Sequence, residues 1–232
     1  MLGAVKIAAP PELMPVPAGL FPMRSEILLI RHGETLWNGE GRIQGHRDSP
    51  LSALGRAQAA AVGARLASEG VDHLASSDLG RALETAAAVA DATDLEIFVD
   101  ARLRERSYGA LEGLTWADIE RDLPADFARL SSHDPNYRPA RGESLMDFRD
   151  RVLGVLDELG RAAAGARAAI VTHGGVLGVL YREVNRIPYD VPRNYTLANA
   201  SINRFVLEDG SWRLEHWGDV EHLETTLDDW ER

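Results

Sequence analysis

The chain has 232 residues, of which 45% are hydrophobic and 26% are charged, the composition of an ordinary globular protein. Its formal net charge of -11 argues against extended binding to nucleic acid, which requires a basic surface. The absence of cysteine excludes disulfide bonds and thiol catalysis. No apolar run approaches the roughly 20 residues that cross a bilayer, so we expect a cytoplasmic protein with no membrane partner.

The first stretch, 1–24, differs from the rest of the chain. It has neither the apolar centre nor the cationic start of a signal peptide. Prolines interrupt any regular helix there, at Pro10, Pro11, Pro15, Pro17 and Pro22. We predict a poorly ordered extension over 1–24, with Met23 as an alternative natural start, and a single domain over 25–232. An arm packed on that domain is the alternative.

The most informative stretch runs from Ile27 to Thr35 and reads Ile-Leu-Leu-Ile-Arg-His-Gly-Glu-Thr. Its four apolar residues predict a buried strand, and Gly33 allows a tight turn directly after it. In open α/β sheets, ligands bind just past the carboxyl ends of strands, where Arg31 and His32 would lie. The guanidinium of Arg31 suits phosphate, and His32 could be a base, a ligand or a nucleophile.

Helix and strand patterns alternate through the first half of the chain. A loop over 38–50 leads to a helix that has Ser52 as its N-cap and ends at Gly70. Strands are expected at 73–76 and 96–99, with a second helix between them. This alternation predicts a mostly parallel sheet that is covered on both faces.

The second half begins with a less regular segment, 100–142, in which Thr115 caps a short helix. Ser144 then caps a long helix, and a second buried strand, 169–172, leads into another helix. The last strands, over 201–207 and 212–217, flank Asp209-Gly210 and predict a terminal hairpin.

Two of these strands end in a histidine followed by glycine, so His32 and His173 should lie at the same edge of the sheet. Arg81 starts a helix after a third strand, where backbone N–H groups favour anions. Two arginines and two histidines should therefore surround a space for a dianion, and the cations should keep at least one imidazole neutral near pH 7. These features match phosphoryl transfer. Metal ligation is the alternative, but no further ligand has a recognisable spacing, so no metal is expected.

Four ordered motifs resemble the histidine phosphatase superfamily, which includes the cofactor-dependent phosphoglycerate mutases. They are Arg31-His32-Gly33-Glu34-Thr35, Ser77-Asp78-Leu79-Gly80-Arg81-Ala82, Leu103-Arg104-Glu105 and Thr172-His173-Gly174-Gly175. Further matches are Asn38, Gln44-Gly45, 48–52 and 142–145. The resemblance covers nearly all of 26–222. It implies a three-layer α/β/α sandwich of the phosphoglycerate mutase type with a mostly parallel central sheet.

The resemblance also implies roles for individual residues. His32 would be the nucleophile that forms a phosphohistidine, and Glu105 the general acid that protonates the leaving oxygen and then the base that activates water. Arg31, Arg81 and His173 would hold the phosphate and stabilise the transition state. The other substrate-binding residues would be Asn38, Gln44, Gly45 and Gly174.

Three functions stay open: a phosphomonoesterase for a small phosphorylated metabolite, a phosphoglycerate mutase, and a non-catalytic phosphate-binding module. Mutases commonly follow the second histidine with Gly-Asn-Ser and carry a longer basic insertion, where this chain has Gly174-Gly175-Val176 and a shorter, more acidic 106–141. The phosphatase is therefore favoured, with no cofactor; a mutase would need bisphosphoglycerate as a primer. The substrate cannot be read from the sequence, and a homodimer stays open.

Other residues near these motifs have ordinary interpretations. Glu112 lies close to Glu105 in the sequence and could pair with an arginine. Arg138 and Arg141 form either a second anion contact or a surface charge cluster. Histidines outside the motifs are expected in solvent, namely His46, His133, His216 and His222. Aromatic residues of the middle segment are expected in packing roles, namely Trp116, Phe127 and Tyr137.

Overall fold

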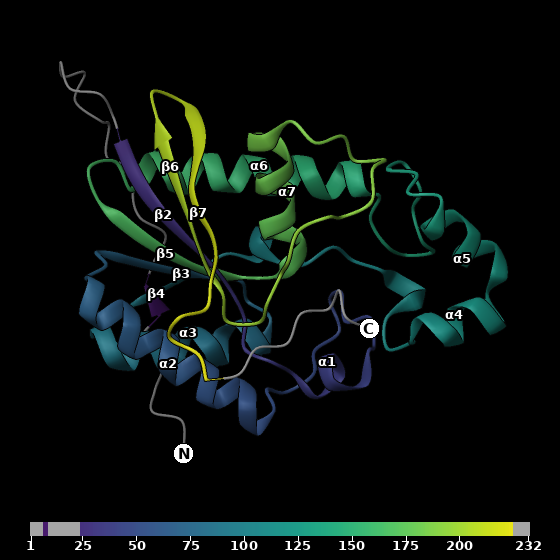
Figure 1. Cartoon of the computed structure of the whole chain (residues 1–232), viewed down its shortest axis with the longest axis horizontal. Helices are drawn as coiled ribbons and strands as arrows, with labels where there is room; N and C mark the ends of the chain where they lie inside the picture. Colours follow the sequence, from purple (N-terminus) through teal and green to yellow (C-terminus); the bar gives the residue numbers. More distant parts are fainter. Residues whose placement is uncertain (1–6, 9–23, 225–232) are drawn as a thin grey trace.

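The structure, a computed structural model, describes residues 7–8 and 24–224. Within these residues, seven strands form one sheet in the order β1-β4-β3-β5-β2-β6-β7, with helices on both faces (Figure 1). At one edge, β1 (Ile7–Ala8) pairs in parallel with β4 (Ile97–Val99). Apart from these two residues and Arg24, the predicted N-terminal extension lies outside the described part.

The parallel part of the sheet contains the two apolar runs that the sequence marks as buried strands. β2 (Arg24–Arg31) pairs in parallel with β5 (Arg167–Thr172), and β5 pairs in parallel with β3 (His73–Ser76). β3 in turn pairs in parallel with β4. A strand that is covered on both faces has a continuous apolar run and not an alternating pattern. The strand predictions in this part of the chain are confirmed.

The other edge of the sheet is an antiparallel hairpin. β6 (Ile202–Glu208) pairs with β2, and β7 (Ser211–Asp219) pairs with β6. The turn consists of Asp209 and Gly210, whose φ angles of 49° and 77° are both positive. A two-residue turn of this kind matches the twist of the strands that it joins. The predicted terminal hairpin is confirmed.

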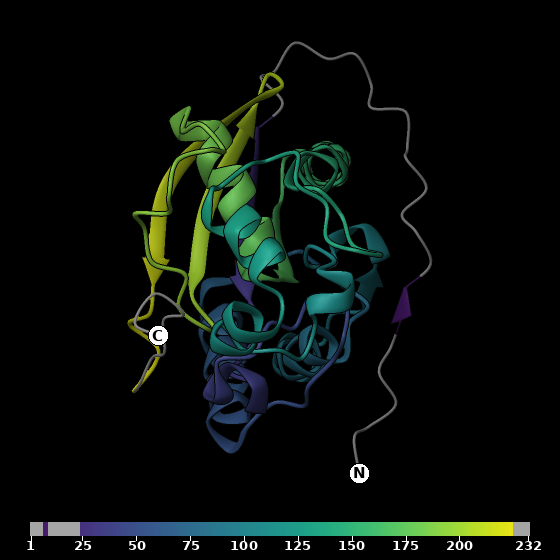
Figure 2. The same cartoon turned by 90° about the vertical axis from the view of Figure 1, so that its right-hand side faces the viewer.

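Two pairs of helices cover the sheet. α2 (Ala53–Glu69) and α3 (Gly80–Thr93) lie on one face, whereas α6 (Leu145–Ala162) and α7 (Gly174–Asn185) lie on the other (Figures 1 and 2). The predicted caps of α2 and α6 are present, because the Ser52 and Ser144 hydroxyls accept hydrogen bonds from the first helical turns. The three-layer α/β/α fold is therefore confirmed.

Side chains of β2 alternate between the two cores that these layers enclose. Leu28 and Ile30 belong to the core with α2 and α3, whereas Ile27 and Leu29 belong to the core with α6 and α7. All four side chains are fully buried, which stabilises the fold by about 1.5–3 kcal/mol for each. The burial of these four side chains fixes the position of β2 within the sheet. It therefore also fixes the point where the chain leaves the sheet at Arg31 and His32.

Short elements occupy the space beyond the carboxyl ends of the parallel strands. They are α1 (Leu36–Glu40), η1 (Ala101–Leu103), η2 (Gly109–Leu111), α4 (Trp116–Asp122) and α5 (Pro124–Ser131). Figure 1 shows α4 and α5 extending from one end of the molecule, away from the sheet. No helix in the described ranges is long and apolar enough to cross a membrane.

Two of these short helices differ from the sequence prediction. The loop predicted from residue 38 actually starts inside α1, because Thr35 and Asn38 cap each other's backbone N–H groups in a capping box. α5 was not predicted, because it has only eight residues, directly follows α4 and starts at a proline, with none of its residues fully buried. The predicted helix after Thr115 is confirmed as α4.

Candidate active site

The two strand-end histidines lie next to each other, directly beyond the carboxyl ends of the neighbouring strands β2 and β5. β2 and β5 are in register, with Arg31 opposite Thr172, so the following residues, His32 and His173, emerge side by side. Their ring centroids are 5.3 Å apart at an interplanar angle of 60°. Both side chains are almost completely buried, with exposed fractions of 3% and 0%. The sheet therefore brings the two imidazoles together, as the sequence predicts.

The orientation of the His32 ring is set by the backbone of the next residue. Its Nδ1 lies 2.8 Å from the carbonyl oxygen of Gly33. A carbonyl can only accept, so Nδ1 carries the proton and Nε2 keeps its lone pair. Gly33 allows the backbone after β2 to pack closely against α2, because a Cβ at this position would lie 2.4 Å from the carbonyl oxygen of Gly55.

The surroundings of both histidines keep the imidazoles neutral. Burial, followed by the charges of Arg81 and Arg31, holds the pKa of His32 well below its ordinary value. Burial and the charge of Arg81 likewise lower the pKa of His173. His173 Nε2 lies 2.8 Å from the Ser77 hydroxyl, at the end of β3. A neutral, oriented imidazole beside fixed cations has the properties of a nucleophile for an anionic group.

Hydrogen bonds to backbone carbonyls hold the Arg31 and Arg81 side chains in place, and Arg81 also binds a carboxylate. Arg81 Nη1 donates to the Arg47 carbonyl at 2.9 Å and to the Asp48 carboxylate at 3.0 Å, and its Nη2 donates to the Gly45 carbonyl at 2.7 Å. Arg31 Nη1 donates to the Leu197 carbonyl. The exposed fractions of Arg31 and Arg81 are only 3% and 1%. Two guanidinium groups are thus held in place beside the histidines.

Arg31, His32, Arg81 and His173 are called the cationic corner below. Within the described residues, Arg81 Nε and His173 Nδ1 are buried and have no hydrogen-bond partner. Buried polar atoms are almost always paired, so unpaired ones mark a place for a ligand. The corner therefore has the charge and the open polar atoms that an anionic group would satisfy.

Glu105 follows η1 in the chain, lines the same pocket as Arg31, His32 and Arg81, and places its carboxylate against the first turn of α7. Its Oε2 accepts a hydrogen bond from the Gly175 N–H at 2.9 Å, and its Oε1 accepts from the Arg106 N–H at 2.8 Å. A Cβ at position 175 would lie 2.1 Å from Oε1. Gly175 is therefore required for the carboxylate to lie where it does, which explains the second glycine of the His-Gly-Gly motif in physical terms.

The segment that carries Glu105 is held in place by α6. Arg151 Nη1 donates to the carbonyls of Arg102 and Arg104 at 2.7 and 3.0 Å, and its Nη2 donates to the Glu105 carbonyl at 3.2 Å. The same guanidinium is paired with the Glu143 carboxylate at 2.8 Å. Arg151 thus fixes the backbone of Glu105 relative to the helix layer.

His46 holds the same backbone from the opposite side. Its Nε2 lies 2.9 Å from the Glu105 carbonyl, and the side chain is half-buried. The prediction that His46 lies in solvent is wrong, because this loop folds back over Glu105. His222 is also half-buried, with Nε2 3.0 Å from the Ala200 carbonyl, whereas His133 and His216 are exposed as predicted.

Glu112 organises the loops around the site instead of taking part in it. Its carboxylate accepts hydrogen bonds from the backbone N–H groups of His46, Arg47, Tyr108 and Gly109, at 2.9 to 3.1 Å. Among the described residues it forms no ion pair with an arginine, so that expectation is wrong. The sequence could not show this, because backbone N–H groups leave no residue-type signal.

The remaining predicted binding residues lie around the same space. Asn38 Oδ1 accepts hydrogen bonds from the Thr35 N–H at 3.1 Å and from Asn199 at 3.3 Å, and Asn38 lines the pocket. Gln44 and Gly45 line it as well, and Gln44 Oε1 is buried without a partner in the described part of the chain. Gly174 begins α7 beside the Arg31 guanidinium, behind the pocket surface.

The pocket has a volume of about 210 Å³. Besides the predicted residues, it is lined by Trp37, Gly41, Arg42, Ile43, Tyr108 and Trp116. We call Trp37, Ile43, Tyr108 and Trp116 the pocket mouth. These four residues were not predicted in the site. The packing role predicted for Trp116 is met only in part, because its ring contacts Phe127 while 48% of the residue is exposed. The only sequence signal was a tryptophan directly after a helix cap.

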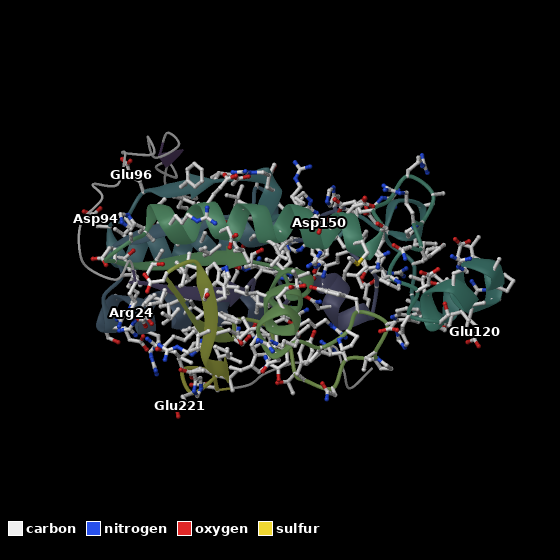
Figure 3. The ribbon with its side chains drawn as sticks, turned by 90° about the horizontal axis from the view of Figure 1, so that it is seen from above. Arg24, Asp94, Glu96, Glu120, Asp150 and Glu221 are labelled. Carbon is white, nitrogen blue, oxygen red and sulfur yellow. The ribbon has the colours of Figure 1, made fainter. Side chains whose placement is uncertain are left out.

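Charge is distributed very differently over the outer surface. Figure 3 shows acidic side chains directed outward, among them Glu96, Glu120, Asp150 and Glu221, all of which are exposed. Arg138 is exposed and paired with a carboxylate, and Arg141 is exposed, as in a surface charge cluster. Among residues 7–8 and 24–224, no group of three or more candidate ligands could hold a metal ion. The expectation of no metal stays a prediction.

Comparison with known proteins adds an independent line of argument. The family model described as the histidine phosphatase superfamily (branch 1) matches residues 27–220. Phosphoglycerate mutase-like protein 4 of Arabidopsis thaliana is 41% identical over 206 residues, which are 87% of this chain and 88% of that protein.

Solved structures of similar fold point to the same family. YhfR of Bacillus stearothermophilus superimposes with a TM-score of 0.79 at 35% identity, covering 86% of this chain and 100% of that one. A mycobacterial glucosyl-3-phosphoglycerate phosphatase gives a TM-score of 0.69 at 32% identity, covering 83% and 98%. The names of these similar proteins include both a mutase-like protein and a phosphatase.

Proposed function

The chain belongs to the histidine phosphatase superfamily, and on that premise we propose that it hydrolyses a small phosphomonoester through a phosphohistidine on His32. The observation that carries the proposal is the neutral His32 ring, whose Nδ1–H is committed to a carbonyl while Nε2 is available beside two fixed guanidinium groups. Arg31, His32, Arg81 and Glu105 line one pocket, and His173 packs against the His32 ring.

In the first step, the cationic corner binds the phosphate dianion. Arg31 and Arg81 supply the charge, and the unpaired Arg81 Nε and His173 Nδ1 gain oxygen partners. Because the guanidinium groups are already oriented by carbonyls, little reorganisation is needed as charge develops in the transition state. Arginines supply this charge in the proposal, so activity should persist in the presence of a strong chelator.

The second step transfers the phosphoryl group to the enzyme. His32 Nε2 attacks phosphorus, the bond from phosphorus to the ester oxygen breaks, and that oxygen takes a proton from Glu105. The alcohol leaves, and the phosphohistidine keeps its Nδ1–H on the Gly33 carbonyl. Water then attacks phosphorus and gives a proton to the Glu105 carboxylate, and breakage of the P–N bond restores neutral His32.

Two features favour hydrolysis over mutation. An asparagine at position 175, the residue common in mutases, is incompatible with the observed place of the Glu105 carboxylate. A mutase must also retain a bisphosphorylated intermediate, which requires further cations. Beyond Arg31 and Arg81, the described pocket lining contains one more cation, Arg42, which donates to the Glu40 carboxylate at 2.6 Å. The described pocket lining therefore has few groups that could bind a second phosphate.

A cofactor-dependent mutase is the second candidate, which the name of the Arabidopsis relative favours. Both reactions share the phosphohistidine, so they differ in whether water or a second hydroxyl reaches it. The test is to incubate the protein with 3-phosphoglycerate, with and without bisphosphoglycerate, and to measure isomer exchange beside free phosphate. We expect phosphate release to dominate. Isomerisation that exceeds phosphate release by a hundredfold would establish the mutase instead.

A further inference from the structure

Building on the proposed hydrolysis, we infer that the substrate's leaving group is a flat, apolar alcohol that packs between the aromatic rings of the pocket mouth. The cationic corner accounts for the phosphate, but it leaves the rest of the substrate unassigned. That part must occupy the outer half of the pocket, because the corner itself is closed by buried strand ends. The chemistry of the outer half therefore indicates the class of the alcohol.

Large apolar side chains dominate this outer half. Trp37, Ile43, Tyr108 and Trp116 line it together. Trp116 is 48% exposed, although a tryptophan on the surface of a small domain is normally packed away from water. The pocket as a whole is about as polar as it is apolar, and these four are its large apolar side chains.

The aromatic surfaces are held at a fixed separation by the backbone. Gly113 N–H donates to the Ile43 carbonyl at 2.7 Å, and Ile43 N–H donates to the Leu114 carbonyl at 2.9 Å. These bonds tie the loop after α1 to the residues just before Trp116. The Trp37 ring lies over Gly113, since a Cβ there would be 3.3 Å from Trp37 Cη2. The mouth is therefore shaped before any substrate arrives, which reduces the entropic cost of binding.

Trp116 has its own support on the opposite side. It is the first residue of α4, whose start is fixed by the capping box between Thr115 and Asp118. Its ring packs nearly perpendicular to the Phe127 ring, at a centroid distance of 6.3 Å and an interplanar angle of 76°. Because Trp116 is 48% exposed, part of its ring surface stays open for a further flat partner.

Beyond the corner, the described pocket lining contains one cation, Arg42, and it is already paired. Arg42 donates through Nε to Glu40 at 2.6 Å and through Nη1 to the Gly113 carbonyl at 2.7 Å, so its charge is countered on the spot. The carboxylate of an ester of an acid such as glycerate would therefore find no unpaired cation in this lining, whereas an aryl or aralkyl alcohol would contact the rings of the mouth.

The experiment measures binding by titration calorimetry with three phosphonates, so that it does not depend on turnover. Benzylphosphonate carries a flat apolar group, 2-hydroxyethylphosphonate a neutral polar group, and phosphonoacetate a carboxylate. We expect benzylphosphonate to bind at least about tenfold more tightly than the other two, the ratio typical of one well-placed apolar contact. Phosphonoacetate binding as tightly as benzylphosphonate, or no measurable binding of benzylphosphonate, would overturn the inference.

Variants locate the preference within the mouth. Trp116→Ala should weaken benzylphosphonate binding by about three- to tenfold, with little change for 2-hydroxyethylphosphonate. Leu36→Ala is the matched control, because Leu36 is an apolar side chain of α1 that is 51% exposed and lies outside the pocket lining. Equal effects of Trp116→Ala on all three phosphonates, or an equal effect of Leu36→Ala, would also overturn it. A protein that binds benzylphosphonate but releases no phosphate from any ester would contradict the proposed function alone.

Discussion

The cationic corner and the pocket mouth are adjacent halves of one pocket, but they are built in opposite ways. The corner consists of three residues at the ends of strands and one at the start of α3, all at most 3% exposed, and backbone carbonyls orient its side chains. The mouth consists of residues from short helices and loops, and it leaves Trp116 48% exposed. Substitution in the mouth therefore disturbs little else, whereas substitution in the corner changes a buried network.

This difference separates chemistry from selectivity. Charge stabilisation needs groups that do not move as the transition state forms, which burial at the end of a parallel sheet provides. Selection among alcohols needs a surface that can vary without loss of the fold, which loops provide. Variants in each half should then have distinct kinetic signatures.

The largest effect is expected for Arg81→Ala. Removing one preoriented donor of the corner should lower kcat by about 10²- to 10³-fold, with a smaller change in KM, because the charge that Arg81 meets grows in the transition state. Steady-state kinetics with an aryl phosphate measures both constants. Arg56→Ala is the control, since Arg56 is an exposed arginine that is paired with Glu84 outside the pocket. A change in KM alone would show that Arg81 binds the ground state and the transition state equally.

A smaller effect, dependent on the substrate, is expected for Gly175→Ala. The added Cβ would displace the Glu105 carboxylate, and positioned general acids contribute about 10²- to 10⁴-fold. We expect a loss near the lower end with benzyl phosphate and a much smaller loss with p-nitrophenyl phosphate, whose leaving oxygen needs no proton. Gly154→Ala in α6 is the control, because a Cβ there has no atom within 4 Å. Equal losses of activity with both esters would show that Glu105 does not act as the general acid.

The burial of the corner should also appear in the pH dependence of stability. His32 and His173 have lowered pKa values in the folded state, so below the unfolded pKa the unfolded chain binds more protons. The free energy of unfolding should fall as the pH drops below about 6.5, by at most about 1.4 kcal/mol per pH unit for each histidine. Urea denaturation of the wild type and of His173→Gln between pH 7 and 5 measures the slope.

His173→Gln should make that slope shallower, whereas His133→Gln should leave it unchanged because His133 is exposed. The exposed mouth has no part in this effect. A slope that is the same in all three proteins would mean that carboxylates alone cause the acid sensitivity and that the histidines are not held neutral by burial.

The same contrast explains what could be predicted from the sequence. The run Ile27–Ile30 and the glycines after His32 and His173 were sufficient to place the corner, because buried parallel strands and their tight ends leave a strong residue pattern. Arg81 followed from its position at the start of a helix after a third strand. The placement of the two histidines at the same end of the parallel strands then required only the usual topology of α/β proteins, whereas the strand order came from the structure.

The mouth left no comparable pattern. α1 has five residues and α5 has eight, so neither is long enough for a sustained periodic pattern. His46 and Glu112 act through backbone groups distant in the sequence, which no local pattern records. An isolated aromatic residue such as Trp116 gives the same sequence signal whether it packs against other side chains or lines a binding pocket. Tertiary contacts between loops decide these positions, and they were visible only in the structure.

The most direct test of the central claim is a single-turnover reaction with a phosphate ester labelled in its phosphoryl group. The reaction is quenched in base, and the labelled peptide is mapped in the wild type and in His32→Ala. The proposal predicts one adduct on His32 that is stable in base, labile in acid and absent from a folded His32→Ala protein. No adduct, an acid-stable adduct, or labelling that persists in His32→Ala would contradict it.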